Sequence, residues 1–283
     1  MPRMRFPSLA LASLSLVLAS AGCSSSSSGP GATTGADPIA PTSTTPADAS
    51  YFAQANNQSE TLVNAYFQLT TAGGTPCTSE VVAGCTITTC TKSGTTATTV
   101  NLDPGALSVT SASLGTGTPV ALTGGYGRIV KEVPFPAGEL VELKGAGGAD
   151  FPAFDVTATI PPVLSGLGFD GCTSTSADAP CVLSASGSVA SWTGATGATV
   201  GLSLSPTLDT ATQLSLSCRW DGAGGAGRIP GEALAKLPKG QSYRPYFSTT
   251  TTPSTIVTGA KYRLSVGANR VLMGGTIAVK TAS

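Results

Sequence analysis

Phe154-Asp155-Val156-Thr157-Ala158-Thr159-Ile160 alternates apolar and polar side chains, and this pattern decides the fold class. A period of two is typical of a β-strand with one buried face. The same alternation recurs in Leu107–Thr110, Val200–Leu204, Leu214–Cys218, Tyr262–Val266 and Ile277–Val279. Turn-forming stretches separate these runs, among them Asp103-Pro-Gly105, Gly124-Gly125, Gly145-Ala-Gly-Gly148 and Gly194-Ala-Thr-Gly197. Many short strands divided in this way predict an all-β protein built as an antiparallel β-sandwich.

The best internal boundary is Pro161-Pro162, because proline cannot donate a ladder hydrogen bond. It divides the folded part into two predicted sandwich-like halves, residues 50–162 and 163–283. One short helix is expected at Pro230–Leu237, which begins with proline, carries Glu232 in its first turn and is followed by Pro238.

The N-terminus has the layout of a removed signal peptide. Arg3 and Arg5 precede an apolar run, Phe6–Leu18, that is shorter than the ~20 residues a membrane-spanning helix needs. Ser20-Ala21-Gly22-Cys23 then resembles the lipobox of bacterial lipoproteins, in which cleavage precedes a cysteine that becomes lipidated. We therefore expect residues 1–22 to be removed and Cys23 to carry the lipid. Ser24 after the cysteine implies the outer membrane, by analogy with Gram-negative lipoproteins.

Residues 23–49 are rich in Ser, Gly, Thr, Pro and Ala and contain little that could be buried. The entropy of ordering such a segment would go unopposed, so it is expected to be a disordered tether between the lipid and the folded part.

The chain carries 15 basic and 15 acidic residues, and charged residues make up only 11% of it. This balance provides no broad basic field, so nucleic acid is not an expected partner.

Seven cysteines include six besides Cys23, an even number that indicates disulfides in an exported chain. Spacing favours three pairs: Cys77 with Cys85, Cys172 with Cys181, and Cys90 with Cys218. The first two pairs would each close a short polar loop. A metal site is not expected, because the chain has no histidine and no Cys-x-x-Cys pair.

Two segments carry a family resemblance. Phe135–Phe154 and Trp192–Leu204, the latter leading to Cys218, look like parts of uncharacterised Gly/Thr-rich bacterial lipoproteins of predicted β-sandwich fold. The second segment also resembles fibronectin-like modules of secreted proteins. The resemblance implies a sandwich fold and an envelope location, and it implies no activity.

Most catalytic chemistry is excluded by what the sequence lacks. Without histidine, Ser-His-Asp and Cys-His mechanisms cannot operate, and the serine motifs Gly-x-Ser-x-Gly and Ser-x-x-Lys do not occur. A carbohydrate-active enzyme that uses only carboxylates remains an alternative, with scattered candidates at Asp155, Asp170, Asp209 and Asp221.

Gly222-Ala-Gly224-Gly-Ala-Gly227 fits the dinucleotide pattern Gly-x-Gly-x-x-Gly. No βαβ unit surrounds it and no ribose-binding acid follows, so a turn is expected here and no cofactor is predicted. Asp221 lacks the alternating acidic partners of a calcium loop.

The aromatic side chains are the remaining candidates for ligand contact. Trp220 beside the glycine-rich loop, together with Arg244 and Tyr246, could stack on and hydrogen-bond a sugar or a peptide. Trp192 is expected in the core. The sequence therefore predicts a lipid-anchored, non-catalytic binding or structural module, whose partner is an envelope protein or a glycan. An accessory subunit of an envelope assembly is the third alternative.

Overall fold

The computed structural model describes residues 35–40, 47–56, 60–71, 77–92, 98–132, 135–172, 179–207, 211–251, 254–273 and 279–282. The predicted signal peptide 1–22 and Cys23 lie outside these residues. No helix in the described part is long and apolar enough to cross a membrane.

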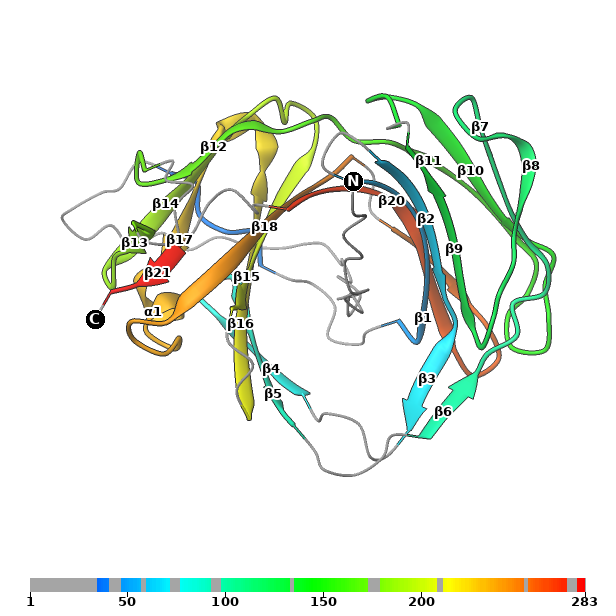
Figure 1. The fold of residues 1–283 in the computed structure, drawn as a ribbon, viewed down its shortest axis with the longest axis horizontal. Helices are drawn as coiled ribbons and strands as arrows, with labels where there is room; N and C mark the ends of the chain where they lie inside the picture. The colour runs from blue at the N-terminus through cyan, green and yellow to red at the C-terminus, as the bar shows by residue number, and fades with distance from the viewer. Residues whose placement is uncertain are drawn as a thin grey trace, which may run out of the picture.

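One long, curved sheet forms the frame of the molecule (Figure 1). Its strands are, in order, β4 (Cys77–Val82), β5 (Cys85–Thr91), β16 (Thr212–Asp221), β15 (Thr199–Pro206), β18 (Ser242–Thr250), β20 (Arg263–Met273), β1 (Ala49–Asn56), β2 (Glu60–Tyr66) and β9 (Tyr126–Lys131). Three short strands join this path, β13 (Cys181–Leu183), β19 (Thr255–Thr258) and β21 (Val279–Thr281). Neighbouring strands on the path are antiparallel except β1 and β20, which are parallel.

Two small sheets pack on the convex side of the long sheet (Figure 1). One contains β12 (Ser165–Phe169), β14 (Gly187–Thr193) and β17 (Ala226–Pro230). The other contains β7 (Leu107–Ser111), β8 (Gly115–Val120), β10 (Leu140–Gly145) and β11 (Phe154–Thr159). A further pair, β3 (Gln68–Thr71) and β6 (Thr98–Asn101), stands apart. The chain is therefore all-β, with two sandwich-like halves, as predicted.

Each half has its own hydrophobic core. The Trp192 core lies beneath β12, β14 and β17, and the Tyr51 core lies beneath β7, β10 and β11. Strand β20 serves both, because Leu264 and Val266 belong to the Tyr51 core while Leu272 belongs to the Trp192 core. The alternation of the predicted strands is thus explained, since their apolar positions are the buried ones.

The cores do not follow the predicted division at Pro161-Pro162. Cys85 and Ile87, from the N-terminal side of the prolines, pack in the Trp192 core. Leu264, from the C-terminal side, packs in the Tyr51 core. Pairing along the long sheet brings distant segments together, so each sandwich contains chain from both 50–162 and 163–283.

Buried Arg270 lies between the two cores on β20. Its Nε donates to the carbonyl oxygen of Pro161 at 3.0 Å, and its Nη2 donates to that of Phe135 at 2.8 Å. Thr249 Oγ1 donates to Pro162 O at 3.0 Å. The segment that joins the halves is therefore fixed to the long sheet.

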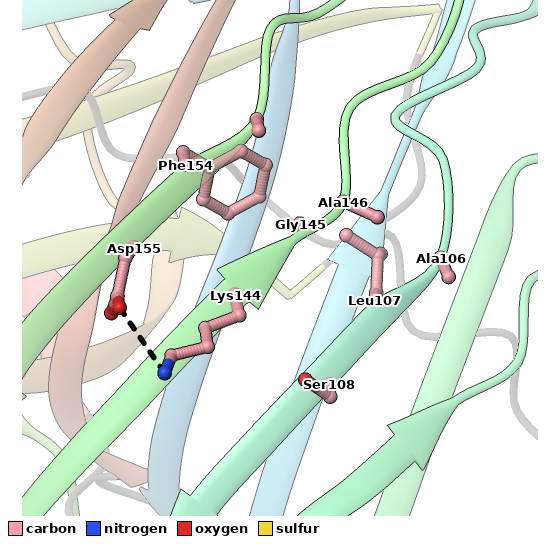
Figure 2. A pocket seen from close by; sticks show the side chains of 9 residues that line it. Ala106, Leu107, Ser108, Lys144, Gly145, Ala146, Phe154 and Asp155 are labelled. Atoms are coloured by element: carbon pink, nitrogen blue, oxygen red, sulfur yellow. Dashed lines mark ion pairs between the residues drawn. The ribbon is translucent and has the colours of Figure 1, made fainter.

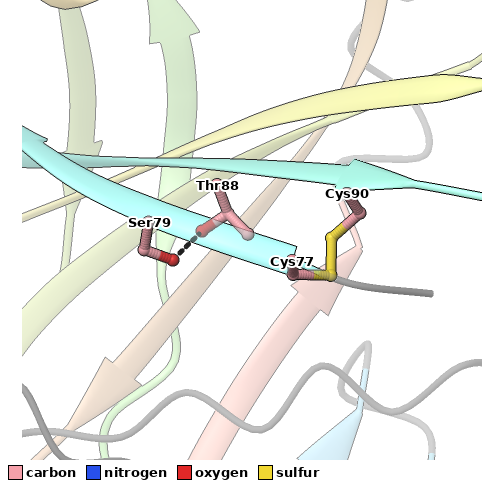
Figure 3. Close-up of a disulfide and its surroundings, with 4 residues drawn as sticks. All are labelled: Cys77, Ser79, Thr88 and Cys90. Atoms are coloured by element: carbon pink, nitrogen blue, oxygen red, sulfur yellow. Dashed lines mark hydrogen bonds between the residues drawn. A yellow bond between two sulfur atoms is a disulfide. The ribbon is translucent and has the colours of Figure 1, made fainter. Parts of the chain in front are cut away.

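Three disulfides connect the strands, and the pairing differs in part from the prediction. Cys172–Cys181 is confirmed, whereas the other two bonds are Cys77–Cys90 and Cys85–Cys218. The predicted pairs Cys77–Cys85 and Cys90–Cys218 were wrong because residues 78–84 are not a loop. They form β4 and a tight turn at Ala83-Gly84, and this hairpin places Cys77 opposite Cys90 (Figure 3).

The predicted helix is shorter than expected. Only α1 (Gly231–Leu234) is α-helical, and turns continue from Ala235 to Leu237 before Pro238. Ala233, Leu234 and Leu237 are buried in the Trp192 core, so the amphipathic pattern is confirmed although the helix is a single turn.

Part of the predicted tether is docked on the fold. Ala36 forms a parallel bridge with Gly227, its N–H donating to Ala226 O at 3.2 Å and its carbonyl accepting from Arg228 N at 2.8 Å. Ile39 N donates to Arg219 O at 2.7 Å. Residues 35–40 therefore cover the edge of β17, and Ala49 already begins β1. The prediction of a disordered tether over all of 23–49 was wrong for these residues, because unpaired backbone groups at a sheet edge offer them hydrogen bonds.

Candidate functional site

Trp220 is not available to a ligand. Its side chain is fully buried and lies 5.6 Å from the ring of Trp192, centroid to centroid. Trp220 Nε1 donates to the carbonyl oxygen of Arg228 at 3.2 Å. The prediction of ligand contact was wrong because Trp220 shares the inward face of β16 with Leu216 and Cys218. Trp192 is in the core, as predicted, with Nε1 bonded to Gly222 O at 2.9 Å.

Arg244 and Tyr246 lie on the opposite face of the long sheet, the face turned away from both cores, which we call the open face. Along β18, Tyr243 and Phe247 point into the Trp192 core, so Arg244 and Tyr246 point away from it. Arg244 is exposed and Tyr246 is half-buried.

Tyr246 ends a row of hydroxyl side chains that crosses the open face. Cross-strand register pairs Thr86 with Ser217, Ser217 with Ser203, and Ser203 with Tyr246. Next to this row, Arg219 lies on the same face of β16, and burial lowers the pKa of its guanidinium to about 10. This part of the open face is therefore polar and can both donate and accept hydrogen bonds.

An aromatic patch lies on the open face at the other half of the long sheet. It contains Phe52 on β1, Tyr66 on β2 and Tyr126 on β9. The alternate residues of these strands, among them Tyr51, Ala53 and Ala65, are buried in the Tyr51 core, so the three rings point away from it. Tyr66 and Tyr126 are direct cross-strand partners, and Tyr126 is 36% exposed.

Planar polar side chains stand beside these rings. Asn64 and Arg128 are cross-strand partners in the adjacent row, and Phe52 is the partner of Asn64 on the other side. Gly267 follows in that row, and a Cβ there would lie 3.3 Å from Phe52 Cε1. The ring of Phe52 therefore lies close to the bare backbone of β20. Rings flanked by an amide and a guanidinium form a surface suited to stacking and hydrogen bonding.

The open face also holds polar atoms that the protein leaves unused. Ser203 Oγ, Ser265 Oγ and Asn269 Oδ1 are buried and have no hydrogen-bond partner in the described part of the chain. Their alternate neighbours Leu202, Leu204, Leu264 and Ala268 are core residues, which places these atoms on the open face.

The candidate carboxylates are not brought together. Asp155 is on β11 and forms an ion pair with Lys144, Asp170 accepts from Val189 N at 2.7 Å, and Asp221 caps the 3₁₀ turn η1 (Gly222–Gly224). Asp209 lies outside the described residues. Among the described residues, no three His, Cys, Asp or Glu side chains gather as a metal site would require.

The glycine-rich segment forms η1 and the start of β17, with no helix at its end that could hold a pyrophosphate. Gly227 lies beneath Trp220, where a Cβ would come within 2.2 Å of the indole. Close packing explains Gly222 and Gly227, and the positive φ of 66° explains Gly225.

A depression of about 530 Å³ lies on the small sheet of the Tyr51 core (Figure 2). Lys144 at its floor forms ion pairs with Glu142 at 2.9 Å and Asp155 at 3.2 Å. Hydrogen bonds to these two carboxylates raise the pKa of Lys144. Because the charge of Lys144 is already compensated, this depression is a weaker candidate than the open face.

The aromatic patch was not predicted from the sequence. The signal was present, since Tyr51, Ala53 and Ala55 alternate with Phe52 and Gln54. What the sequence does not show is that β1, β2 and β9 are neighbours whose outward rings share one face.

Known proteins resemble this chain only weakly. No family model and no curated protein matches the chain. Among solved structures, the FN1–FN3 domains of chicken CNTN1 align with a TM-score of 0.24 and 11% identity, over 75% of this chain and 65% of that one. The chain thus spans less than two thirds of that structure. Domains A168–A170 from titin align with a TM-score of 0.19 and 9% identity, over 78% of this chain and 95% of that one. The fold described above rests on the chain's own structure.

Proposed function

We propose that this protein is a lipid-anchored, non-catalytic binding module of the bacterial cell envelope, and that it binds a glycan on the open face of its long sheet. The aromatic patch of Phe52, Tyr66 and Tyr126 carries this proposal, because its rings are turned away from the core that buries their neighbours. Rings of this kind stack on the apolar faces of sugars, and Asn64 and Arg128 offer hydrogen bonds beside them.

The anchor is proposed from sequence. Arg3 and Arg5, the short apolar run and Ser20-Ala21-Gly22-Cys23 support export, cleavage and lipidation of Cys23, and Ser24 supports transport to the outer membrane. Several acyl chains on one cysteine would hold the protein lastingly, whereas a single chain binds only marginally.

Binding is tested with the purified full chain carrying Cys23→Ser, screened against bacterial envelope polysaccharides by affinity electrophoresis. The variant that adds Tyr66→Ala and Tyr126→Ala should lose affinity by about tenfold or more, since each stacked ring contributes about 0.5–1.5 kcal/mol. Leu140→Ala is the matched control, because this 62% exposed side chain lies on a small sheet.

A glycan that binds wild type and the double tyrosine variant equally well would contradict the proposed site. Unchanged thermal unfolding of the variants is required for the comparison. Labelling with radioactive palmitate tests the anchor separately, and label incorporated equally into wild type and Cys23→Ser would contradict lipidation at Cys23.

A further inference from the structure

Basic side chains gather on the open face. The cations at outward strand positions of this face are Arg128, Arg219, Arg244, Arg263 and Lys280. Of these, Arg128 and Arg244 are exposed, and neither takes part in an ion pair of the described residues. These two guanidinium groups are available to a ligand.

Cations outnumber carboxylates at the described strand positions of the open face, because several carboxylates lie elsewhere. Glu80 pairs with Lys236 beside α1, and Glu142 and Asp155 pair with Lys144 on the small sheet. At the described strand positions of the open face the carboxylates are Glu60, the cross-strand partner of Asn56, and Asp221, which is occupied in capping η1. Asp48, just before β1, accepts from Arg263 N at 2.8 Å. A chain with equal numbers of acidic and basic residues thus presents a basic open face.

Arg128 and Arg244 each have a tyrosine two residues away on the same strand. Tyr126 and Arg128 lie on β9, and Arg244 and Tyr246 lie on β18. Residues two apart on a strand point to the same face, so each pair combines a ring for stacking with a guanidinium for an anion. One pair belongs to each half of the molecule.

The separation of the two pairs follows from register. Arg128 shares a row with Asn64, Phe52 and Gly267, whereas Tyr246 is paired with Met273. Four strand spacings and six residue rises therefore separate Arg128 from Tyr246, or about 30 Å along the sheet. Arg270 fixes the junction of the halves, so this separation is constant.

We infer that the open face binds an extended anionic polysaccharide, one that carries carboxylate or sulfate groups and contacts both arginine–tyrosine pairs at once. This inference rests on the proposed function and specifies its ligand. The basic face supplies charge complementarity to an acidic chain. A flexible polymer that reaches both pairs gains avidity over a fragment that reaches one.

The test uses the full chain with Cys23→Ser and a matched pair of polymers, polygalacturonate and its fully methyl-esterified form, in which methyl esters replace the charged carboxylates. Polygalacturonate should bind, and its affinity should fall steeply as salt rises from 50 to 500 mM, because exposed charges are screened. Arg128→Gln and Arg244→Gln should each weaken binding of the long polymer by about tenfold. A disaccharide fragment, which reaches one pair at a time, should bind weakly, and each substitution should remove only one of its two sites.

Lys239→Gln is the control, because this exposed cation lies in the turn after α1. Equal, salt-independent binding of both polymers, with both arginine variants unaffected, would overturn the anionic ligand while leaving the proposed function intact. Preference for duplex DNA or for phosphatidylglycerol vesicles over polygalacturonate would also overturn it. If the protein bound no polysaccharide at all, and the tyrosine variants were indistinguishable from wild type, the proposed function would be contradicted as well.

Discussion

Gly227 packs against the indole ring of Trp220, and a substitution here tests the packing of the Trp192 core. A Cβ at this position would lie 2.2 Å from Trp220 Cδ2, in a core where Trp220 cannot move without displacing Trp192. Gly227→Ala should therefore lower the free energy of unfolding by about 1–3 kcal/mol, as overpacked cores do. Urea unfolding, monitored by tryptophan fluorescence, measures this change in the free energy of unfolding. Gly224→Ala is the control, because nothing lies within 4 Å of its Cβ. Equal midpoints for the two variants would contradict the ring position.

Asp103 ties two loops of the Tyr51 half together and makes stability depend on pH. Its Oδ1 accepts from Gly105 N at 2.8 Å and its Oδ2 from Ala149 N at 3.2 Å, and these hydrogen bonds lower the pKa of its carboxyl. Because the folded pKa lies below the unfolded value of about 3.9, the stabilisation is complete above that pH and is lost as pH falls through the folded pKa.

Asp103→Asn should accordingly reduce stability at pH 7 and flatten the loss of stability below about pH 4. Urea midpoints of both proteins between pH 7 and pH 2.5 give the two slopes. Parallel curves would show that Asp103 does not titrate differently in the folded and unfolded chains.

At the scale of elements, one disulfide closes the β4–β5 hairpin and another joins it to β16, and the two differ greatly in span. Cys85–Cys218 closes 133 residues, whereas Cys77–Cys90 closes 13. The chain-entropy model gives about 5 kcal/mol for the first and about 3 kcal/mol for the second. The double variant Cys85→Ala/Cys218→Ala should therefore unfold at lower urea than Cys77→Ala/Cys90→Ala. Equal losses would mean that residual structure in the unfolded chain cancels the entropy difference.

The strands themselves could be predicted from local pattern. The alternation of apolar and polar residues predicted β11, β15 and β16, because each of these strands has one face in a core. The disulfide pairing could not be predicted from spacing, although Ala83-Gly84 held a signal. Both residues have positive φ, 47° and 84°, and the two-residue turn they form sets the register that pairs Cys77 with Cys90.

The pairing of strands that are distant along the chain could not be predicted from the sequence. β1 and β20 are parallel neighbours although more than 200 residues separate them, and nothing local in either strand specifies the other. The aromatic patch depends on such pairings, because Phe52 meets Gly267 only through β20. Trp220, in contrast, could have been assigned to the core, since it continues the alternation of Leu216 and Cys218.

At the scale of the whole molecule, the two sandwiches are inseparable. β20 belongs to both cores, and the Trp192 core needs Cys85 and Ile87 from the other side of Pro161-Pro162. Residues 50–162 and 163–283 expressed separately should therefore both fail to fold, as judged by the lack of dispersed amide signals in NMR spectra. Mixing them under oxidising conditions should restore signals. A stable fold of either piece alone would contradict the shared cores.

The docking of residues 35–40 against β17 would limit how far the molecule reaches from a lipid on Cys23. If Cys23 bears the acyl chains as proposed, only residues 24–34 lie between the membrane and the first docked residue, and a fully stretched chain of that length reaches about 40 Å. With that anchor, the short connection would keep the protein next to the bilayer. It would then meet partners embedded in or lying on the membrane at high local concentration and would not reach those farther away.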